Sequence, residues 1–328
     1  MDKSPWISPK TGNKLYYGTN SLAAHNEEFK NLGNNIFDLR YPEELHAEDQ
    51  LAHDFYEGRA FDYEKFLHLT FETYGVDEDT TRSDMVNRLM LKSDSKVLEI
   101  ASGTGRDTSI INNRLDDGCE IHITDISFDM MKACYNKLNK KSDNSPKQFF
   151  SLVNAMKLPF EDNYFDALYS FGAVGEFSDP KKFFEEAIRV CKPGSKIVVG
   201  DENLPVWLRD CEFGQILANY NKQFLTPIPF ESLPVEARNV KCEWVIGGVF
   251  YLLEFEVGLG EPYANFDFEI PGIRGGTHKT RMFGQLEGVT LEVRQLAWEA
   301  QQKTGISMHK WLNNIVKRES LKVLGKEK

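Results

Sequence analysis

Residues 97–108, Val-Leu-Glu-Ile-Ala-Ser-Gly-Thr-Gly-Arg-Asp-Thr, restrict the folds open to this chain more than any other segment. A short apolar run contains the acid Glu99, a turn with two glycines follows, and polar residues then begin a helix. Gly103 and Gly105 can adopt positive φ and bring the backbone close to a ligand. The segment therefore predicts a strand, a ligand-binding loop and a helix N-terminus, in that order, as at a nucleotide site of an α/β fold.

A dinucleotide is one ligand that such a loop binds. The dinucleotide fingerprint requires a third glycine three residues after the second one, where it allows close helix packing. Thr108 occupies that position. The pyrophosphate-binding form of the loop is therefore incomplete, and the neighbouring segments must decide which nucleotide fits.

Residues 120–125 alternate as a short strand and end in Asp125, 20 residues after Gly105. Doubly wound folds place a carboxylate at this position, where it accepts hydrogen bonds from the ribose hydroxyls. The alternative role is a plain N-cap for the helix that follows Ser127. Further along, Asp179 and Pro180 predict the start of a helix. Residues 191–200 predict its end and a buried strand.

In order and spacing, these segments resemble class I S-adenosylmethionine (SAM) methyltransferases with a small-molecule, UbiE-type core, over roughly 110 residues. The resemblance implies an α/β fold, with a Rossmann-like seven-stranded sheet and helices on both faces. It implies SAM as the cofactor and S-adenosylhomocysteine (SAH) as its product. It also implies the cofactor-binding residues: Glu99, Ala101, Ser102, Gly103, Gly105, Asp125, Ile126, Asn154, Ala155, Met156 and Ser170. The family usually has an acid at the position of Asn154 for the adenine amino group, and an amide oxygen can accept that bond without charge.

The sequence divides into three regions. Residues 1–45 are similar to the small Trm112-like zinc-ribbon module, in which cysteines stand where this chain has Ser8 and Thr11. Hydroxyl groups are poor zinc ligands, so we expect no metal there, and two or three short strands packed on the main domain. Residues 46–258 form the predicted SAM-binding domain, which closes with an antiparallel hairpin around Gly247-Gly248 at the sheet edge.

Residues 259–328 form a C-terminal extension. The glycine-rich segment 271–281, with Arg274, His278 and Arg281, suits an anionic substrate or a surface turn. Residues 289–316 predict two helices broken at 303–307, because Gly305 suits a helix C-terminus and Ser307 an N-cap. This arrangement is similar to ribbon-helix-helix dimerisation modules and indicates a homodimer; the alternative is a pair of helices docked on their own chain.

The composition indicates which classes of binding partner and which cellular location to expect. The net charge of −11 disfavours bulk nucleic acid and anionic membranes. No segment approaches 18 uninterrupted apolar residues, so we expect no membrane span. The five scattered cysteines form no C-x-x-C pair, and the first residues contain no apolar signal core, so we expect a reduced, cytoplasmic protein.

Methyl transfer from a sulfonium is an in-line displacement that needs a base only if the acceptor carries a proton. The candidate catalytic residues are Glu176, Tyr63 and His278. Glu176 follows the predicted fourth strand, near the transferred methyl; the alternative is a helix-end carboxylate in solvent. Tyr63 belongs to an Asp62-Tyr63 pair of the kind that closes over SAM in related small-molecule enzymes, and an amphipathic helix with core aromatics explains it equally well.

Three functions remain open at this point. The first is a SAM-dependent methyltransferase with a small-molecule acceptor. The second is an RNA or protein methyltransferase, which the Trm112-like segment favours, while the acidic balance and the absence of an amino-methylation signature at 170–173 oppose it. The third is a non-catalytic SAM-binding regulatory or scaffold protein. An enzyme needs a cavity over the methyl, lined by residues from 61–71 and 171–177, whereas a scaffold fills that space with its own side chains.

Overall fold

The computed structural model describes residues 3–138, 145–273, 275–282 and 290–326. It divides into two compact units, Met1–Pro262 and Tyr263–Lys328, which are described separately below.

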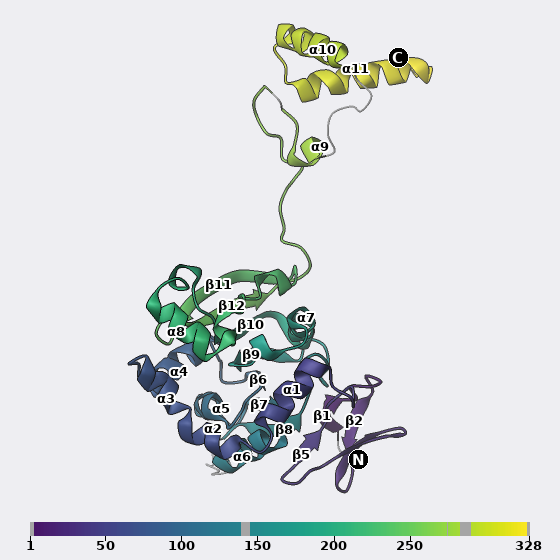
Figure 1. Cartoon of the computed structure of the whole chain (residues 1–328). Coiled ribbons are helices and arrows are strands. Elements are labelled where there is room, and N and C mark those ends of the chain that lie inside the picture. The colour runs from purple at the N-terminus through teal and green to yellow at the C-terminus, as the bar shows by residue number, and fades with distance from the viewer. Residues whose placement is uncertain (1–2, 139–144, 274, 283–289, 327–328) are drawn as a thin grey trace. The chain divides into compact units, whose positions relative to one another are not determined.

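The first unit contains an eight-stranded sheet in the order β11-β12-β10-β9-β6-β7-β8-β5 (Figure 1). Neighbouring strands from β5 to β10 run parallel, and β12 runs antiparallel between β10 and β11. The strands are β5 (Ile36–Asp38), β6 (Lys96–Ile100), β7 (Glu120–Asp125), β8 (Lys147–Leu152), β9 (Phe165–Phe171), β10 (Cys191–Glu202), β11 (Ala237–Val245) and β12 (Phe250–Val257). This architecture confirms the predicted Rossmann-like α/β fold and the hairpin at its edge. The predicted number of seven strands is one too low, because β5 joins the sheet from the N-terminal region.

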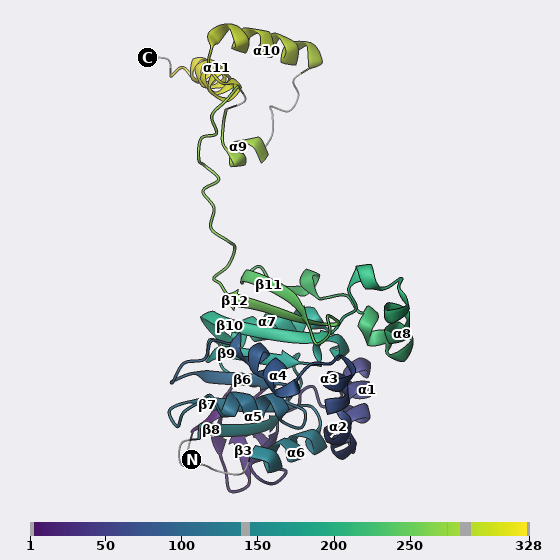
Figure 2. The same ribbon diagram turned by 90° about the vertical axis from the view of Figure 1, so that its left-hand side faces the viewer.

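Both faces of the parallel strands are covered, so these strands are apolar along most of their length. One face packs against α4 (Glu78–Asn87), α5 (Arg106–Asn112) and α6 (Phe128–Leu138). The other face packs against α7 (Pro180–Val190) and the N-terminal strands (Figures 1 and 2). Helix α7 begins as predicted, with Pro180 in the first turn and the Asp179 side chain accepting the N–H of Lys182.

The N-terminal region forms its own antiparallel sheet, in the order β1-β2-β3-β4. Its strands are β1 (Lys3–Ile7), β2 (Lys14–Tyr17), β3 (Ser21–Ala24) and β4 (Glu27–Lys30). The expectation of two or three strands is therefore too low. Trp6 and Leu15 are buried in one cluster with Phe160 and Phe165, so this sheet shares a core with the main domain. The Ser8 hydroxyl accepts the N–H groups of Lys10 and Thr11 and so closes a turn.

Three helices precede α4 in the chain: α1 (Ala47–Tyr56), α2 (Ala60–Phe66) and α3 (His68–Thr73). Between β9 and β12 lie α8 (Glu212–Tyr220) and the short 3₁₀ turns η1 (Val174–Glu176), η2 (Val206–Leu208), η3 (Lys222–Leu225) and η4 (Phe230–Ser232). Residues of α1, α2, α3, η1, α8 and η3 line one end of the cavity described below.

The second unit contains α9 (His278–Met282), α10 (Leu291–Thr304) and α11 (Met308–Val323). Gly305 has φ 67° at the end of α10, and the Ser307 side chain accepts the N–H of Lys310 at the start of α11, which confirms the predicted helix break. In the part of the chain that the structure describes, no helix combines the length and the apolar character needed to cross a membrane.

Candidate functional site

The loop after β6 has the backbone that its sequence predicts. Ala101, Gly103 and Gly105 have φ values of 55°, 54° and 82°. A Cβ atom added to Gly105 would lie 2.5 Å from the Sγ atom of Cys134 on α6, so this glycine allows close helix packing. Ala101, Ser102 and Gly103 line a cavity, and Gly105 does not. Gly105 therefore affects the loop through its close packing against α6 and not through contact with the cavity.

Asp125 lies at the end of β7, beside that loop. Its Oδ2 atom accepts the N–H of Gly103 at 2.8 Å, and its Oδ1 atom accepts the N–H of Ser127 at 2.9 Å. The Ser127 hydroxyl accepts the N–H of Met130, so Ser127 caps α6 and Asp125 is not needed for that role. Burial raises the pKa of Asp125 to about 6. Asp125 and Ile126 both line the cavity.

Glu99, at the end of β6, has a carboxyl oxygen without a protein partner. The residue is 2% exposed, and its Oε2 atom accepts no hydrogen bond within the described part of the chain. Burial raises the pKa of this carboxyl well above its ordinary value. The Ser102 hydroxyl in the same cavity wall also has no hydrogen-bond partner among the described residues. Buried polar atoms without partners are costly, so these two groups fit a bound polar ligand.

The predicted adenine-side residues are only partly in place. Asn154 and Ala155 line the cavity, and Met156 does not. The Asn154 Oδ1 atom accepts the N–H of Met156 at 2.9 Å, so it already has one partner within its own turn. Ser170 is fully buried in β9, where its hydroxyl has no partner among the described residues, and it does not line the cavity.

These residues surround one end of a cavity of about 1170 Å³. The opposite end, here called the acceptor end, is formed by residues from α1 to α3, the segments after β9 and β10, and β12. Most of its wall is aromatic or aliphatic: Phe55, Tyr56, Phe66, Leu67, Phe71, Tyr74, Phe171, Ile216, Tyr220, Phe224 and Phe250. The cavity is large enough for a nucleoside cofactor and a second small molecule side by side.

Two of the three predicted catalytic residues line this cavity, Glu176 and Tyr63. The Tyr56 hydroxyl donates to the Oε1 atom of Glu176 at 3.1 Å, and burial raises the pKa of Glu176 to about 7. The Tyr63 ring lies 3.8 Å from where a Cβ atom on Gly103 would be. Glu176 is therefore a half-buried group with a fixed partner rather than a helix-end carboxylate in open solvent.

His278 belongs to the second unit and does not line the cavity. In the same glycine-rich segment, Arg281 donates two hydrogen bonds to the Gly275 carbonyl oxygen, so its guanidinium closes its own loop. Arg274 lies outside the described residues. The structure thus brings Glu176 and Tyr63 together and leaves the role of His278 a prediction.

The sequence analysis did not single out Glu202, which ends β10 and also lines the cavity. Burial, together with the neighbouring carboxyl group of Asp201, raises the pKa of Glu202 above its ordinary value. Asp201 in turn accepts the N–H of Gly175 at 2.6 Å. Two acids directly after a buried parallel strand were the signal that could have indicated this position.

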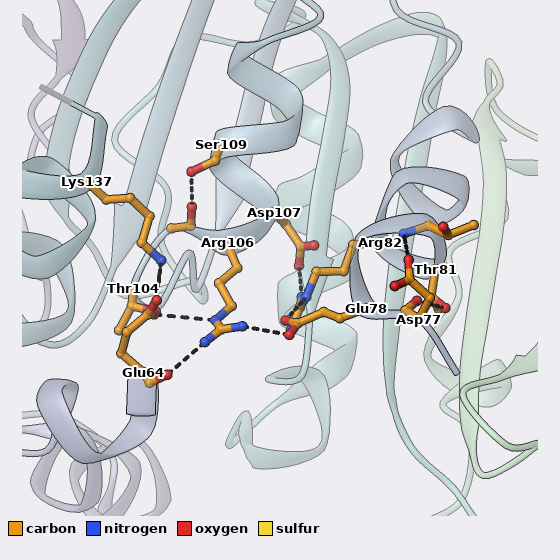
Figure 3. Close-up of polar contacts among 12 residues, drawn as sticks. Glu64, Asp77, Glu78, Thr81, Arg82, Thr104, Arg106, Asp107, Ser109 and Lys137 are labelled. Atoms are coloured by element: carbon orange, nitrogen blue, oxygen red, sulfur yellow. Dashed lines mark hydrogen bonds and ion pairs between the residues drawn. The ribbon is translucent and has the colours of Figure 1, made fainter. Parts of the chain in front are cut away.

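An ion-pair network fixes α2 and α4 beside the first loop (Figure 3). Arg82 of α4 donates to Glu78 and to Asp107 of α5, both at 2.8 Å. Arg106 donates to Glu78 at 2.7 Å and to the backbone oxygen of Glu64 at 2.7 Å. The Glu64 carboxylate also binds Lys137 of α6 and Thr104 of the loop. The helices over the cavity are thereby tied to the loop that shapes it.

Comparison with known proteins identifies the domain that carries this site. Residues 98–199 match the family model described as Methyltransferase domain. The chain contains a class I SAM-dependent methyltransferase domain. Among its relatives are a ubiquinone/menaquinone biosynthesis C-methyltransferase, UbiE, of Pectobacterium atrosepticum and a demethylmenaquinone methyltransferase of Paenarthrobacter aurescens, each 33% identical. These alignments cover 35% and 38% of this chain and 46% of either relative, so the chain spans about half the length of the curated relatives that it matches.

Among solved structures, the chain is similar to phosphoethanolamine N-methyltransferase 2 of Haemonchus contortus in complex with SAM. That match has a TM-score of 0.45 and 13% identity, and it covers 58% of this chain and 56% of the other. The family match covers the methyltransferase domain between β6 and β10, and it includes neither α1 to α3 nor Glu202. The Trm112-like interpretation of residues 1–45 stays a prediction.

Proposed function

We propose that the chain is a SAM-dependent methyltransferase that transfers the methyl group to a small-molecule acceptor by in-line displacement. The observation that carries the proposal is a single cavity whose wall has carboxyl groups beside the glycine loop at one end and mostly aromatic and aliphatic side chains at the other. Asp125 and Glu99 supply carboxylate oxygens beside the glycine loop, and Glu176 lies in the wall of the same cavity. The relatives that match the domain are small-molecule methyltransferases by name, which supports a small acceptor.

SAM, when bound, supplies an electrophilic methyl group on a sulfonium whose departure leaves a neutral thioether. The chain's residues bind, align and dehydrate the two partners. When SAM is bound, Asp125 would accept hydrogen bonds from the two ribose hydroxyls, and the unpartnered oxygen of Glu99 would accept from the polar end of the cofactor. The aromatic wall excludes water, and alignment of this kind lowers barriers by about 7–11 kcal/mol.

Glu176 is the proposed proton acceptor of the reaction. Its pKa of about 7 suits a group that must be ionised to accept a proton and that returns it to solvent near neutral pH. Tyr56 holds its Oε1 atom, so one carboxylate oxygen stays oriented within the wall. Tyr63 packs beside Gly103, and burial raises the pKa of its phenol to about 12, so it acts as a neutral hydroxyl rather than as a base.

The two other functions fit the cavity less well. A scaffold protein would fill the space over the methyl, whereas about 1170 Å³ is open here. An RNA acceptor needs cations for its phosphates, and the two arginines that line the cavity, Arg82 and Arg106, are both ion-paired.

The five cysteines are free, which supports the proposal of a reduced, cytoplasmic location.

We also propose that the second unit pairs with a second copy of the chain. Large apolar side chains of α10 and α11 are exposed in the described unit, among them Val293, Leu296 and Val316. Exposed apolar side chains of this kind on neighbouring helices favour association. This proposal is independent of the catalytic one.

Transfer of label from methyl-tritiated SAM tests the function. The full chain is incubated with a cell extract separated into small molecules, RNA and protein. We expect label in the small-molecule fraction, and at least a tenfold lower rate for Glu176→Gln with SAH affinity unchanged. Label in the RNA or protein fraction would favour the second function, and SAH binding without any transfer would favour the third.

A further inference from the structure

The acceptor end of the cavity combines carboxyl groups with aromatic rings. Glu176 and Glu202 both line it, and Asp201 stands directly behind Glu202. The aromatic residues around them come from α1, α2, the end of α3, β9 and β12: Tyr56, Tyr63, Tyr74, Phe171 and Phe250. A ligand at this end therefore meets π faces and carboxyl oxygens together.

No cation balances these carboxyl groups within the described residues. The positively charged side chains in the cavity wall are Arg82 and Arg106. Arg82 is paired with Glu78 and Asp107, and Arg106 with Glu64 and Glu78, which leaves neither for the acceptor end. Neither Glu176 nor Glu202 takes part in an ion pair there, and the hydrogen-bond partner of Glu176 is the neutral Tyr56.

The raised pKa values of side chains at the acceptor end have the same cause, an excess of buried carboxyl groups over cations. Burial first, and then the charge of Asp201, raises the pKa of Glu176 to about 7. Burial also raises the pKa of the Tyr74 phenol to about 12, with the charge of Glu202 adding to it. Buried carboxylates beside one another are costly unless a proton or a cation enters between them.

We propose that the methyl acceptor is an amine, which binds as a cation between the carboxyl groups of Glu176 and Glu202 and the surrounding aromatic rings. This proposal rests on the proposed methyltransferase function and names its substrate class. Aromatic faces attract ammonium groups, and carboxylates accept their N–H hydrogens. Before methylation one N–H bond breaks, its proton goes to the Glu176 carboxylate, and the electron pair stays on nitrogen as the nucleophile.

Other acceptor classes fit this end less well. A phosphate or carboxylate on the acceptor would meet Glu176 and Glu202 with like charge. A neutral phenol or quinone would fill the aromatic part of the wall and leave the carboxyl groups without a counter-charge. The relatives whose names refer to quinone biosynthesis match stretches of 119 and 126 residues, which are 35% and 38% of this chain.

The experiment compares three probes with one aromatic ring and different charge. Phenethylamine, 2-phenylethanol and 3-phenylpropanoate are titrated calorimetrically at pH 7 into the free full chain and into its SAH complex. We expect phenethylamine to bind at least tenfold more tightly than 2-phenylethanol, and 3-phenylpropanoate to bind most weakly. Equal affinities, tighter binding of the alcohol or the anion, or no binding of the amine would overturn the proposal.

Two variants locate the effect. Glu202→Gln keeps the size of the side chain and removes its ability to ionise when a cation binds, so it should weaken phenethylamine at least tenfold and leave 2-phenylethanol within twofold. Glu212→Gln is the matched control, because Glu212 on α8 is exposed and does not line the cavity, and all affinities should stay unchanged. Unchanged amine affinity in Glu202→Gln, with its melting temperature retained, would contradict the proposal. If Glu202→Gln does not fold, the three-probe order in the wild-type chain decides.

Failure of this proposal and failure of the proposed function are distinguishable. SAH is titrated into the wild-type chain before the probes. Absence of SAH binding contradicts the methyltransferase function. In that case the relative affinities of the three probes for the free chain still test the amine site. SAH binding together with a preference for the alcohol leaves the methyltransferase intact and removes the amine.

Discussion

The two ends of the cavity are built in different ways. At the nucleoside end, Glu99 and Asp125 stand at the ends of adjacent parallel strands, and each is followed within a few residues by its own loop and helix. At the acceptor end, Glu176 and Glu202 also lie at the ends of adjacent parallel strands, β9 and β10, but Tyr56, which donates to Glu176, comes from α1 and lies 120 positions earlier in the chain. The nucleoside end is thus fixed by short-range geometry, whereas the acceptor end also depends on the packing of distant helices over the strand ends.

The largest effect should come from Asp125→Ala, which breaks the nucleoside end alone. Two hydrogen bonds to a charged carboxylate contribute about 3–6 kcal/mol together, so SAH should bind at least about 100-fold more weakly. Calorimetric titration of SAH measures this change. Asp117→Ala, at an exposed turn, is the control and should change nothing. A loss below threefold for Asp125→Ala would remove the ribose assignment.

A second variant tests how firmly the two ends are joined. Arg82→Met removes the ion pair with Glu78 within α4 and the buried ion pair with Asp107 of α5, and it leaves Asp107 buried without its cation. Breaking a buried pair in this way costs about 3–5 kcal/mol, which thermal and urea unfolding will show. Arg318→Met breaks an exposed pair with Glu319 and should cost under about 0.5 kcal/mol. Equal stability of the two variants would show that the network does not hold α4 in place.

The acceptor end has a pH dependence of its own. The pKa of Glu176 is raised to about 7, so this group is mostly protonated below that pH and ionised above it. Because the ionised form accepts the proton, kcat/KM should rise about tenfold per pH unit up to about 7 and then level off. Infrared difference spectra of wild type minus Glu176→Gln should show a protonated carboxyl band that disappears over the same range. A band already absent at pH 5.5 would contradict the raised pKa.

The smallest effect on the site is expected from the second unit. Leu296→Arg in the full chain places a charge on the exposed apolar surface of α10, and should convert a dimer into a monomer in light scattering. SAH affinity should stay within twofold, because none of the described residues of this unit lines the cavity. A monomeric wild-type chain would contradict the pairing of the second unit.

These differences explain what could be predicted from the sequence. Residues 97–108 determine a strand, a loop and a helix within one short segment, so their fold could be predicted locally. The pair Gly305 and Ser307 fixed the break between α10 and α11 in the same way. Strand β5 has three residues and no periodicity of its own, and it forms only because the edge of β8 offers hydrogen-bond partners. The number of strands was therefore wrong in both sheets.

The residues of the acceptor end were also harder to predict from the sequence, because their arrangement depends on tertiary contacts. Glu176 could be placed because it follows β9 closely, whereas its hydrogen bond to Tyr56 joins residues 120 positions apart. Glu202 is the second of two acids that end β10, but this signal gives it no role by itself, and the packing of α1 to α3 over the strand ends places it in a cavity wall. Long-range packing of this kind leaves little trace in the local sequence pattern.

A crystal structure of the full chain with SAH tests the central claim most directly. The account predicts that both ribose hydroxyls lie within hydrogen-bond distance of the Asp125 carboxylate, and that the sulfur points into the space between Glu176 and the aromatic wall. SAH bound outside this cavity, or lying with its sulfur turned away from Glu176, would contradict it.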